Sequence, residues 1–440
     1  MGHIARLKLF GWSDRIIRRN PLYYPRAREL LARFDALAPA AQREWRRQRL
    51  RRLLDAAAHT RYGQRHGGSS FLGDWPLLEK EALRARARDF LTPSGWLGVA
   101  AATSGTTGTP LELRRSLGSI AYEQAVLDRI IEWMGVPRAA RAAVLRGDDV
   151  KPLSERQPPY WRLANGGRRL IFSSNHLDRE SVGAFIEALR AYAPDVLLAY
   201  PTVLASLCSL MLERGESLPI PVTVCSSEVL TAEMSSLAQA VLGTRVLDYY
   251  GQAERVGFAW GDPHGGYRFE PTYSVNELRH VESTEDAEVY ELIGTTLWNT
   301  AMPLVRYRTG DQFLLARGTS AAAVADGLES FRGIVGRSGD YLISPSGAHL
   351  MGIDHIPRSV PHLVRAQFVQ ESLDEVTLRV IPAPGFDEAC RRLLLAHARR
   401  KLPPEMRLTI ETTAELLRNA SGKAPLVVRR LPGSERALHP

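Results

Sequence analysis

The chain has only three cysteines and no long hydrophobic run. Cys208, Cys225 and Cys390 are far apart in the sequence, and their odd number and spacing argue against a disulfide framework or a metal site. Cys208 and Cys225 lie in apolar surroundings and are expected to be buried thiols. No apolar stretch reaches the roughly eighteen residues that suggest a membrane span. The N-terminus lacks an apolar core and a cleavage site, so we expect no signal peptide and a cytoplasmic location.

The sequence also lacks the signatures of nucleic-acid-binding modules. It carries 57 basic and 48 acidic residues, a net charge of +9, which permits binding to acidic partners. No zinc-finger spacing or RNA-recognition motif accompanies this charge, so we expect no nucleic-acid partner. The densest run of arginines, residues 43–52, alternates with apolar residues at helical spacing. It predicts an amphipathic helix with a solvated basic face, rather than a binding patch.

Short apolar runs alternate with helical patterns from about residue 99 onward. Strand-like runs at Ala142–Leu145, Asp195–Tyr200 and Pro221–Val224 are separated by helical segments, a pattern typical of α/β folds with mainly parallel sheets. A chain of 440 residues is expected to form roughly two or three domains. We predict a helical segment at 1–66, a large α/β domain at 67–335, a hinge at 336–340 and a small α+β domain at 341–440.

The most informative segment is rich in hydroxyl groups and glycine. It reads Thr-Ser-Gly-Thr-Thr-Gly-Thr-Pro and directly follows an apolar run. Backbone N–H groups and hydroxyls in such a loop can surround an anion, because glycine lets the backbone approach closely. A Walker loop has a longer spacer between its glycines and a following lysine, so this is a different kind of phosphate loop. A solvated turn is the alternative for the loop taken alone. The candidate phosphate-binding residues are Thr103, Ser104, Gly105, Thr106, Thr107 and Gly108.

Three further motifs follow this loop along the chain. Tyr249–Glu254 and Tyr307–Asp311 each come after a strand-like run, and Asn419–Lys423 forms a polar turn before another. Together the four motifs resemble, in order and approximate spacing, the core motifs of the adenylate-forming superfamily. That family includes acyl-CoA synthetases, adenylation domains and luciferases. The resemblance covers most of the chain and is greatest to the phenylacetate–CoA ligase and CapK branch.

The resemblance implies a nucleotide site for ATP. The hydroxyl-rich loop would hold the β- and γ-phosphates, and Tyr250 would lie against the adenine. Asp311 would accept hydrogen bonds from both ribose hydroxyls, a geometry that suits one carboxylate. Ordinary packing of the tyrosine and a Thr-Gly-Asp turn are the alternatives for these two residues. The implied nucleotide set is completed by Ser227, Glu228, Gly251 and Arg337.

The resemblance also implies two catalytic residues and an acyl pocket. Glu254 would hold Mg²⁺, which commonly takes one or two protein carboxylates beside phosphate oxygens and water. Lys423, on a small mobile C-terminal domain, would stabilise charge on the reacting phosphoryl group. A surface lysine is the alternative for the motif taken alone. His176 and Tyr200 would border the acyl pocket, although a structural histidine fits His176 equally well.

The implied activity is ATP- and Mg²⁺-dependent conversion of a small carboxylic acid to an acyl-adenylate. A thiol, with coenzyme A as the expected acceptor, would then displace AMP. Transfer to an amine or hydroxyl is an alternative within the same class. A non-catalytic nucleotide-binding protein is the alternative outside it, because Thr109 and Gly339 replace residues that are lysine and acidic in many relatives. The identity of the acid and the oligomeric state stay open.

Overall fold

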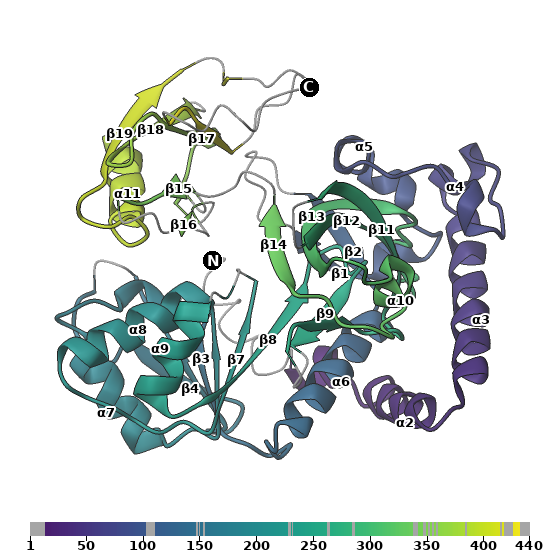
Figure 1. Cartoon of the computed structure of the whole chain (residues 1–440), viewed down its shortest axis with the longest axis horizontal. Helices are drawn as coiled ribbons and strands as arrows, with labels where there is room; N and C mark the ends of the chain where they lie inside the picture. The colour runs from purple at the N-terminus through teal and green to yellow at the C-terminus, as the bar shows by residue number, and fades with distance from the viewer. Residues whose placement is uncertain are drawn as a thin grey trace. The chain divides into compact units, whose positions relative to one another are not determined.

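A computed structural model describes most of the chain (Figure 1). The chain divides into two compact units. The larger comprises Met1–Ala101, Leu113–Thr309 and Phe313–Ile334, and the smaller comprises Ala102–Glu112, Gly310–Gln312 and Val335–Pro440. The described residues are 14–102, 111–146, 148, 150–152, 155–227, 230, 232–261, 265–283, 287–337, 342–345, 349–350, 353, 356–357, 360–382, 385–413, 416–417 and 426–431.

An eight-stranded sheet forms the centre of the larger unit, in the order β10-β9-β8-β7-β6-β3-β5-β4. Neighbouring strands from β5 to β8 run parallel, and the edge strands β4, β9 and β10 are antiparallel. The predicted α/β class with a mainly parallel sheet is therefore confirmed. The strands are β3 (Ala142–Leu145), β4 (Trp161–Ala164), β5 (Arg169–Phe172), β6 (Val196–Ala199), β7 (Val222–Ser226), β8 (Arg245–Gly251), β9 (Phe258–Gly261) and β10 (Tyr267–Phe269).

Helices cover both faces of this sheet, which explains why its central strands are apolar on both sides. One core cluster joins the sheet to α7 (Val182–Tyr192), α8 (Pro201–Glu213) and α9 (Ala232–Leu242). A second cluster joins the opposite face to α6 (Leu117–Trp133) and α2 (Tyr24–Asp35). Figure 1 shows α7, α8 and α9 gathered beside the sheet.

Another sheet has four strands in the order β11-β12-β13-β14. Its strand β13 corrects one expectation, because Tyr307–Asp311 lies inside the strand instead of after it. Buried and less buried residues alternate along β13, as a strand with one covered face requires. The motif resembled a turn because it contains Gly310, which has a φ of +74° in the structure. The strands are β11 (Ser274–Ser283), β12 (Ala287–Thr296), β13 (Tyr307–Ala316) and β14 (Gly333–Arg337).

The smaller unit combines a mixed sheet with one helix. The sheet order is β19-β18-β17-β20, and α11 packs on it through a core that includes Phe368, Leu378 and Leu394. Asp387 caps α11 by accepting a hydrogen bond from the Cys390 amide at 2.9 Å. The predicted domain bounds and hinge stay predictions. The elements are β15 (Leu342–Ile343), β16 (His349–Leu350), β17 (Leu363–Gln370), β18 (Glu375–Pro382), α11 (Glu388–Ala398), β19 (Arg407–Thr412) and β20 (Val427–Arg429).

Short helices and a hairpin make up the remaining described elements. The hairpin of β1 (Val99–Ala102) and β2 (Glu112–Arg115) flanks the hydroxyl-rich loop on both sides. The helices are η1 (Asp14–Arg18), α3 (Pro39–Ala58), α4 (Arg61–Arg65), η2 (Leu72–Asp74), α5 (Lys80–Ala85), η3 (Ala87–Phe90), η4 (Gly95–Leu97), η5 (Ser174–His176) and α10 (Ala321–Ala325).

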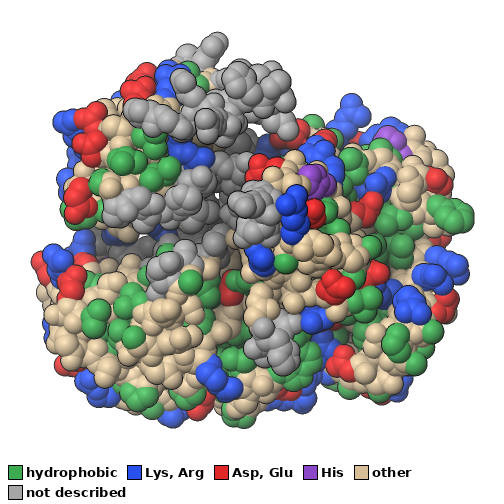
Figure 2. Space-filling model, viewed as in Figure 1, with side chains coloured by type: hydrophobic (Ala, Val, Ile, Leu, Met, Phe, Trp, Pro, Cys, Tyr) green, Lys and Arg blue, Asp and Glu red, His purple; other side chains and the backbone are tan. Residues whose placement is uncertain are grey.

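The arginine-rich segment forms the predicted helix, α3, but its basic face is not wholly solvated. Arg46 pairs with Asp326 at 2.6 Å. Arg49 donates to the Leu297 carbonyl at 2.9 Å and lies 3.9 Å from the centre of the Trp298 ring. Burial lowers the pKa of Arg49 to about 10. These two arginines therefore attach α3 to the end of α10 and to the segment that follows β12. On the face shown in Figure 2, basic and acidic side chains are interspersed across the surface.

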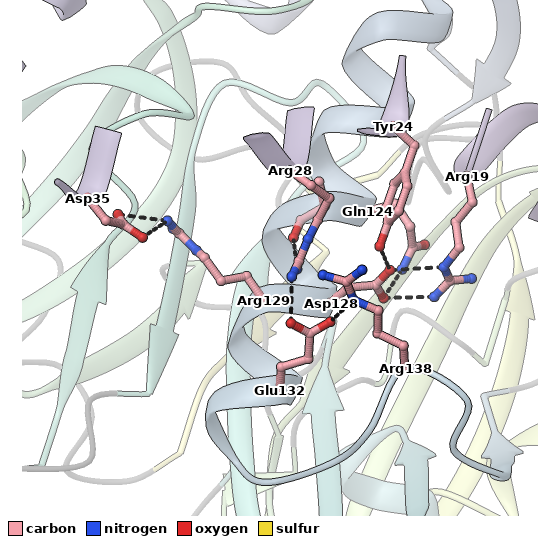
Figure 3. Close-up of polar contacts among 10 residues, drawn as sticks. Arg19, Tyr24, Arg28, Asp35, Gln124, Asp128, Arg129, Glu132 and Arg138 are labelled. Atoms are coloured by element: carbon pink, nitrogen blue, oxygen red, sulfur yellow. Dashed lines mark hydrogen bonds and ion pairs between the residues drawn. The ribbon is translucent and has the colours of Figure 1, made fainter. Parts of the chain in front are cut away.

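Charged residues on α6 hold the N-terminal helices (Figure 3). Asp128 accepts hydrogen bonds from Arg19, Tyr24 and Gln124. Burial beside Asp128 raises the pKa of Tyr24 to about 12, so its hydroxyl stays a donor at neutral pH. The other contacts across α2 and α6 join Arg28 and Arg138 to Glu132, and Arg129 to Asp35.

All three cysteines are buried free thiols, which confirms the expectation for Cys208 and Cys225. Burial in apolar surroundings raises the pKa of Cys208 to about 12, so its thiolate does not form at neutral pH. Among the described residues, no helix has both the length and the apolar character needed to cross a bilayer.

Candidate active site

The candidate site lies at the carboxyl ends of the parallel strands. Strand order reverses around β3, because β5 pairs on one side of it and the next strand, β6, pairs on the other. Such a reversal is where ligands bind in open α/β sheets. The residues that directly follow β3, β5, β6 and β7 are all polar: Arg146, Ser173, Tyr200 and Ser227.

Glu254 follows β8 and is almost completely buried, with 3% of its surface exposed. The Tyr307 hydroxyl donates to Glu254 Oε1 at 2.8 Å, and Lys80 Nζ lies 3.6 Å from the same oxygen. Both contacts go to Oε1, so Oε2 has no partner among the described residues. A hard cation such as Mg²⁺ prefers an oxygen of this kind. The carboxylate predicted from the sequence therefore fits a Mg²⁺ ligand.

Lys80 is a site residue that sequence reasoning missed. A short bridge joins Leu78 to the start of β13: the Leu78 amide donates to the Arg306 carbonyl at 2.9 Å, and the Arg308 amide donates to the Leu78 carbonyl at 3.0 Å. This bridge brings Lys80 beside Glu254 from the start of α5. The only sequence signal is the run Pro-Leu-Leu-Glu-Lys that ends at Lys80, and it does not identify a partner.

Two arginines, partly buried Arg115 and buried Arg255, fix the backbone around Glu254. The Arg115 guanidinium donates to the Ala253 carbonyl at 3.1 and 2.7 Å. Arg255 has a positive φ of 57° and donates to the Ser119 carbonyl at 2.8 Å. It also pairs with Glu123 at 2.9 Å. Since these contacts secure the residue on each side of Glu254, its carboxylate points in a fixed direction.

Tyr249 and Tyr250 lie within β8, which corrects the expectation that they follow the strand. Tyr250 is buried, and its ring packs edge-on against Phe313 with 5.0 Å between centroids. Gln252 Nε2 donates to the Tyr250 hydroxyl at 3.2 Å. Two buried acceptors flank this tyrosine without hydrogen-bond partners in the described chain: Asp248 Oδ1 and Gln252 Oε1. An amino group of a ligand could use such acceptors.

The other predicted site residues lie within or shortly after several strands. Asp311 is buried in β13, Ser227 follows β7 at φ +72°, and Gly251 ends β8. Tyr200 is the N-cap residue of α8. His176 is buried, and both ring nitrogens contact protein groups: Nδ1 lies 2.7 Å from Ser173 Oγ and Nε2 lies 3.2 Å from the Pro152 carbonyl. These contacts hold the imidazole in one orientation.

The sequence is similar to proteins named CapK and phenylacetate–coenzyme A ligase. No protein-family model matches the chain. CapK of Staphylococcus aureus is 23% identical over 318 residues, which cover 71% of this chain and 70% of CapK. A phenylacetate–coenzyme A ligase of Thermus thermophilus is 26% identical over 371 residues, 78% of this chain and 79% of the ligase. The match to the Pseudomonas putida ligase is 25% identical and covers 60% of this chain and 58% of that protein.

The fold matches that of a solved ligase over nearly the whole chain. The crystal structure of 2-hydroxyisobutyryl-CoA ligase with 2-HIB-AMP and CoA covers 90% of this chain and 91% of its own, with a TM-score of 0.54 and 16% identity. The predicted resemblance to the adenylate-forming superfamily is supported by this fold and by sequence relatives named CapK and phenylacetate–coenzyme A ligase.

Several superfamily residues predicted from the sequence lie outside the described residues. These are the loop residues Thr103, Ser104, Gly105, Thr106, Thr107 and Gly108, together with Glu228 and Lys423. The backbone of Arg337 ends β14, and its side chain is not described. The roles of all these residues stay predictions.

The buried carboxyl group of Asp248 makes the stability of the folded protein depend on pH. Burial raises its pKa from 3.8 to about 7, although the Tyr267 hydroxyl donates to Oδ2 at 2.5 Å. The folded protein therefore holds a proton that the unfolded chain has lost, and stability declines as pH rises from about 4 to about 7. Asp248→Asn removes the ionisation. We expect the change in the free energy of unfolding caused by this substitution to be more stabilising at pH 8 than at pH 4.5, by about 1–3 kcal/mol.

Urea unfolding of both proteins at pH 4.5 and pH 8 measures this difference. Asp178→Asn is a control of opposite sign, because hydrogen bonds from the Ser181 and Glu180 amides help to lower the pKa of Asp178. A stability difference for Asp248→Asn that is the same at both pH values would contradict the prediction.

Proposed function

We propose that the protein activates a carboxylic acid with ATP and transfers the acyl group to coenzyme A. One observation carries the proposal: Glu254 is buried at the carboxyl edge of the sheet and fixed in direction, and its contacts with Tyr307 and Lys80 both go to Oε1. A buried carboxylate held in this way is a typical ligand for a nucleotide-bound cation. The names of the sequence relatives and the four sequence motifs support the same activity.

The reaction proceeds in two displacements. A carboxylate oxygen of the acid attacks the α-phosphorus of ATP, a P–O bond breaks, and pyrophosphate leaves with its electron pair. The thiolate sulfur of coenzyme A then attacks the acyl carbon, the bond to the phosphate oxygen breaks, and AMP leaves. Positioned charges supply most of the rate in phosphoryl transfer. The residues proposed for this task are Lys423, the hydroxyl-rich loop and Glu254.

Mg²⁺ bound to Glu254 would neutralise charge on the phosphate oxygens. Other residues of the chain hold Glu254 in a fixed orientation. Arg115 and Arg255 hold the backbone, and the Tyr307 hydroxyl keeps Oε1 oriented. Tyr250 and Asp311 would contact the adenine and the ribose, and Asp248 and Gln252 offer acceptors for the adenine amino group.

ATP–pyrophosphate exchange across a panel of aryl, fatty, hydroxy and amino acids tests the proposal. We expect exchange with one class of acid and a loss of about a hundredfold in Lys423→Ala, the size typical for one preorganised charged contact. Lys401→Ala, in the same unit, is the matched control. Nucleotide binding without exchange for any acid would contradict the proposal and favour a non-catalytic nucleotide-binding protein.

An amine or hydroxyl acceptor is the second candidate for the transfer step. Gly339, which stands where many relatives have an acidic residue in the hinge motif, departs from their pattern at the transfer step, so the acceptor needs a test of its own. Release of AMP with coenzyme A, but not with amines or alcohols, would support the first candidate. The reverse result would support the second.

A further inference from the structure

Arg146 lies at the switch point of the sheet, where the strand order reverses around β3. It directly follows β3, whose last residue, Leu145, pairs with Ala199 of β6. The Tyr200 amide donates to the Leu145 carbonyl at 3.1 Å. On the other side, Val144 pairs with Ile171 of β5, which brings Ser173 to the same level as Arg146. The backbone of Arg146 therefore lies between the strand ends that precede Tyr200 and His176, the two residues proposed for the acyl pocket, and its guanidinium reaches toward β7 and β8.

The contacts of Arg146 are weak for a guanidinium. Nη2 lies 3.4 Å from the Val224 carbonyl, and Nη1 lies 3.5 Å from the Tyr249 hydroxyl. The guanidinium carbon lies 5.9 Å from the centre of the Tyr249 ring. Nε is buried and donates to no acceptor in the described chain. A partly buried cation with long contacts to neutral groups retains most of its capacity to bind an anion.

Arg146 acts to lower the pKa of two carboxyl groups, Asp148 and Asp248, and no ion pair joins it to either one among the described residues. Asp148 follows Arg146 by two positions. Burial raises the pKa of Asp148, and Arg162 opposes this rise more strongly than Arg146 does. Arg18 and Arg169 act in the same direction. Four arginines therefore act on Asp148, and since burial raises the pKa of both Asp148 and Asp248, the local charge around the end of β3 favours an added anion.

We propose that Arg146 selects acids that carry a second carboxylate, so that the substrate is a dicarboxylic acid. This inference rests on the proposed function. One carboxylate of the substrate reacts with ATP, and the other pairs with the Arg146 guanidinium. The planar guanidinium can donate two parallel hydrogen bonds to a carboxylate, which gives both affinity and orientation. A site built for such a pair rejects an analogue that lacks the second charge, because the cation is then left without its partner.

The test compares matched pairs of acids of equal length in ATP–pyrophosphate exchange. Each pair contains a dicarboxylic acid and its half methyl ester, in an aliphatic and an aryl series. For the native protein we expect kcat/KM for the diacid to exceed that for the half ester by at least a hundredfold. Arg146→Met should abolish this preference mainly through KM, and Arg146→Lys should keep part of it. Arg179→Met is the control, because Arg179 is exposed and pairs with Glu213 at 3.0 Å.

The outcomes separate this inference from the proposed function. Equal use of diacids and half esters by the native protein would overturn the inference and leave the proposed function standing. An unchanged preference in folded Arg146→Met would do the same. If Arg146→Met does not fold, Arg146→Lys and the native protein decide the result. Intact nucleotide binding with no exchange for any acid would overturn the proposed function, and this inference with it.

Discussion

Glu254→Gln is expected to lower ATP–pyrophosphate exchange by about a thousandfold, the upper range for loss of one preorganised electrostatic contact. Glutamine keeps the size of the side chain and can still accept from the Tyr307 hydroxyl, so the fold around it should persist. It lacks the charge that a hard cation needs. The fall should therefore be accompanied by a higher Mg²⁺ concentration for half-maximal rate.

Exchange measured over a series of Mg²⁺ concentrations checks this expectation, with thermal melting to confirm folding. Glu213→Gln is the matched control, because Glu213 pairs only with Arg179 on the surface among the described residues. A folded Glu254→Gln protein whose exchange falls less than tenfold, with unchanged Mg²⁺ dependence, would remove Glu254 from the catalytic site.

Arg129→Met should destabilise the protein by about 3–5 kcal/mol, the usual cost of breaking a buried ion pair from one side. Arg129 pairs with buried Glu270 at 2.5 Å and with Asp35 at 2.9 Å. Removing the arginine leaves the Glu270 carboxylate with hydrogen bonds from Thr272 but without a compensating charge. The change should also loosen the attachment of α2 to α6, since Asp35 ends α2.

Urea unfolding of the variant gives the free energy of unfolding directly. The double change Arg129→Met with Glu270→Leu should recover part of the loss, because it removes both charges together. Arg33→Met is the surface control. Its partner Glu29 is exposed, so we expect a change within about 0.5 kcal/mol. A loss below about 1 kcal/mol for Arg129→Met would show that the pair is not coupled to folding as described.

Local patterns predicted the strands and helices of the larger unit well. Ala142–Leu145 and Val222–Ser226 are buried on both faces, so their apolar runs are unambiguous in the sequence. The helix at Pro201 also begins as expected, because proline suits the first turn, and Gly215 adopts φ +65° just beyond its end. Bounds were wrong where polar residues alternate, as in β13, because a half-exposed strand looks like a loop.

Contacts between distant segments could not be predicted from one chain. Glu254 was proposed from its motif, but Lys80 and Arg115 reach it from segments more than a hundred residues away. Arg146 gave no signal in the sequence, because its position depends on how β3, β5 and β6 are ordered in the sheet. The order of the strands in the sheet decides which side chains meet at the site, and this order is set by the complete fold.

Helix α6 also sets a constraint on chain length. Its first turns hold the segment beside Glu254 through Ser119 and Glu123, and its later turns hold the N-terminal helices through Asp128 and Glu132. An inserted residue between these two groups would rotate one against the other by roughly 100° and shift it by about 1.5 Å. Homologous proteins that keep both attachments can vary in the side chains along α6, but they must conserve the number of residues between them.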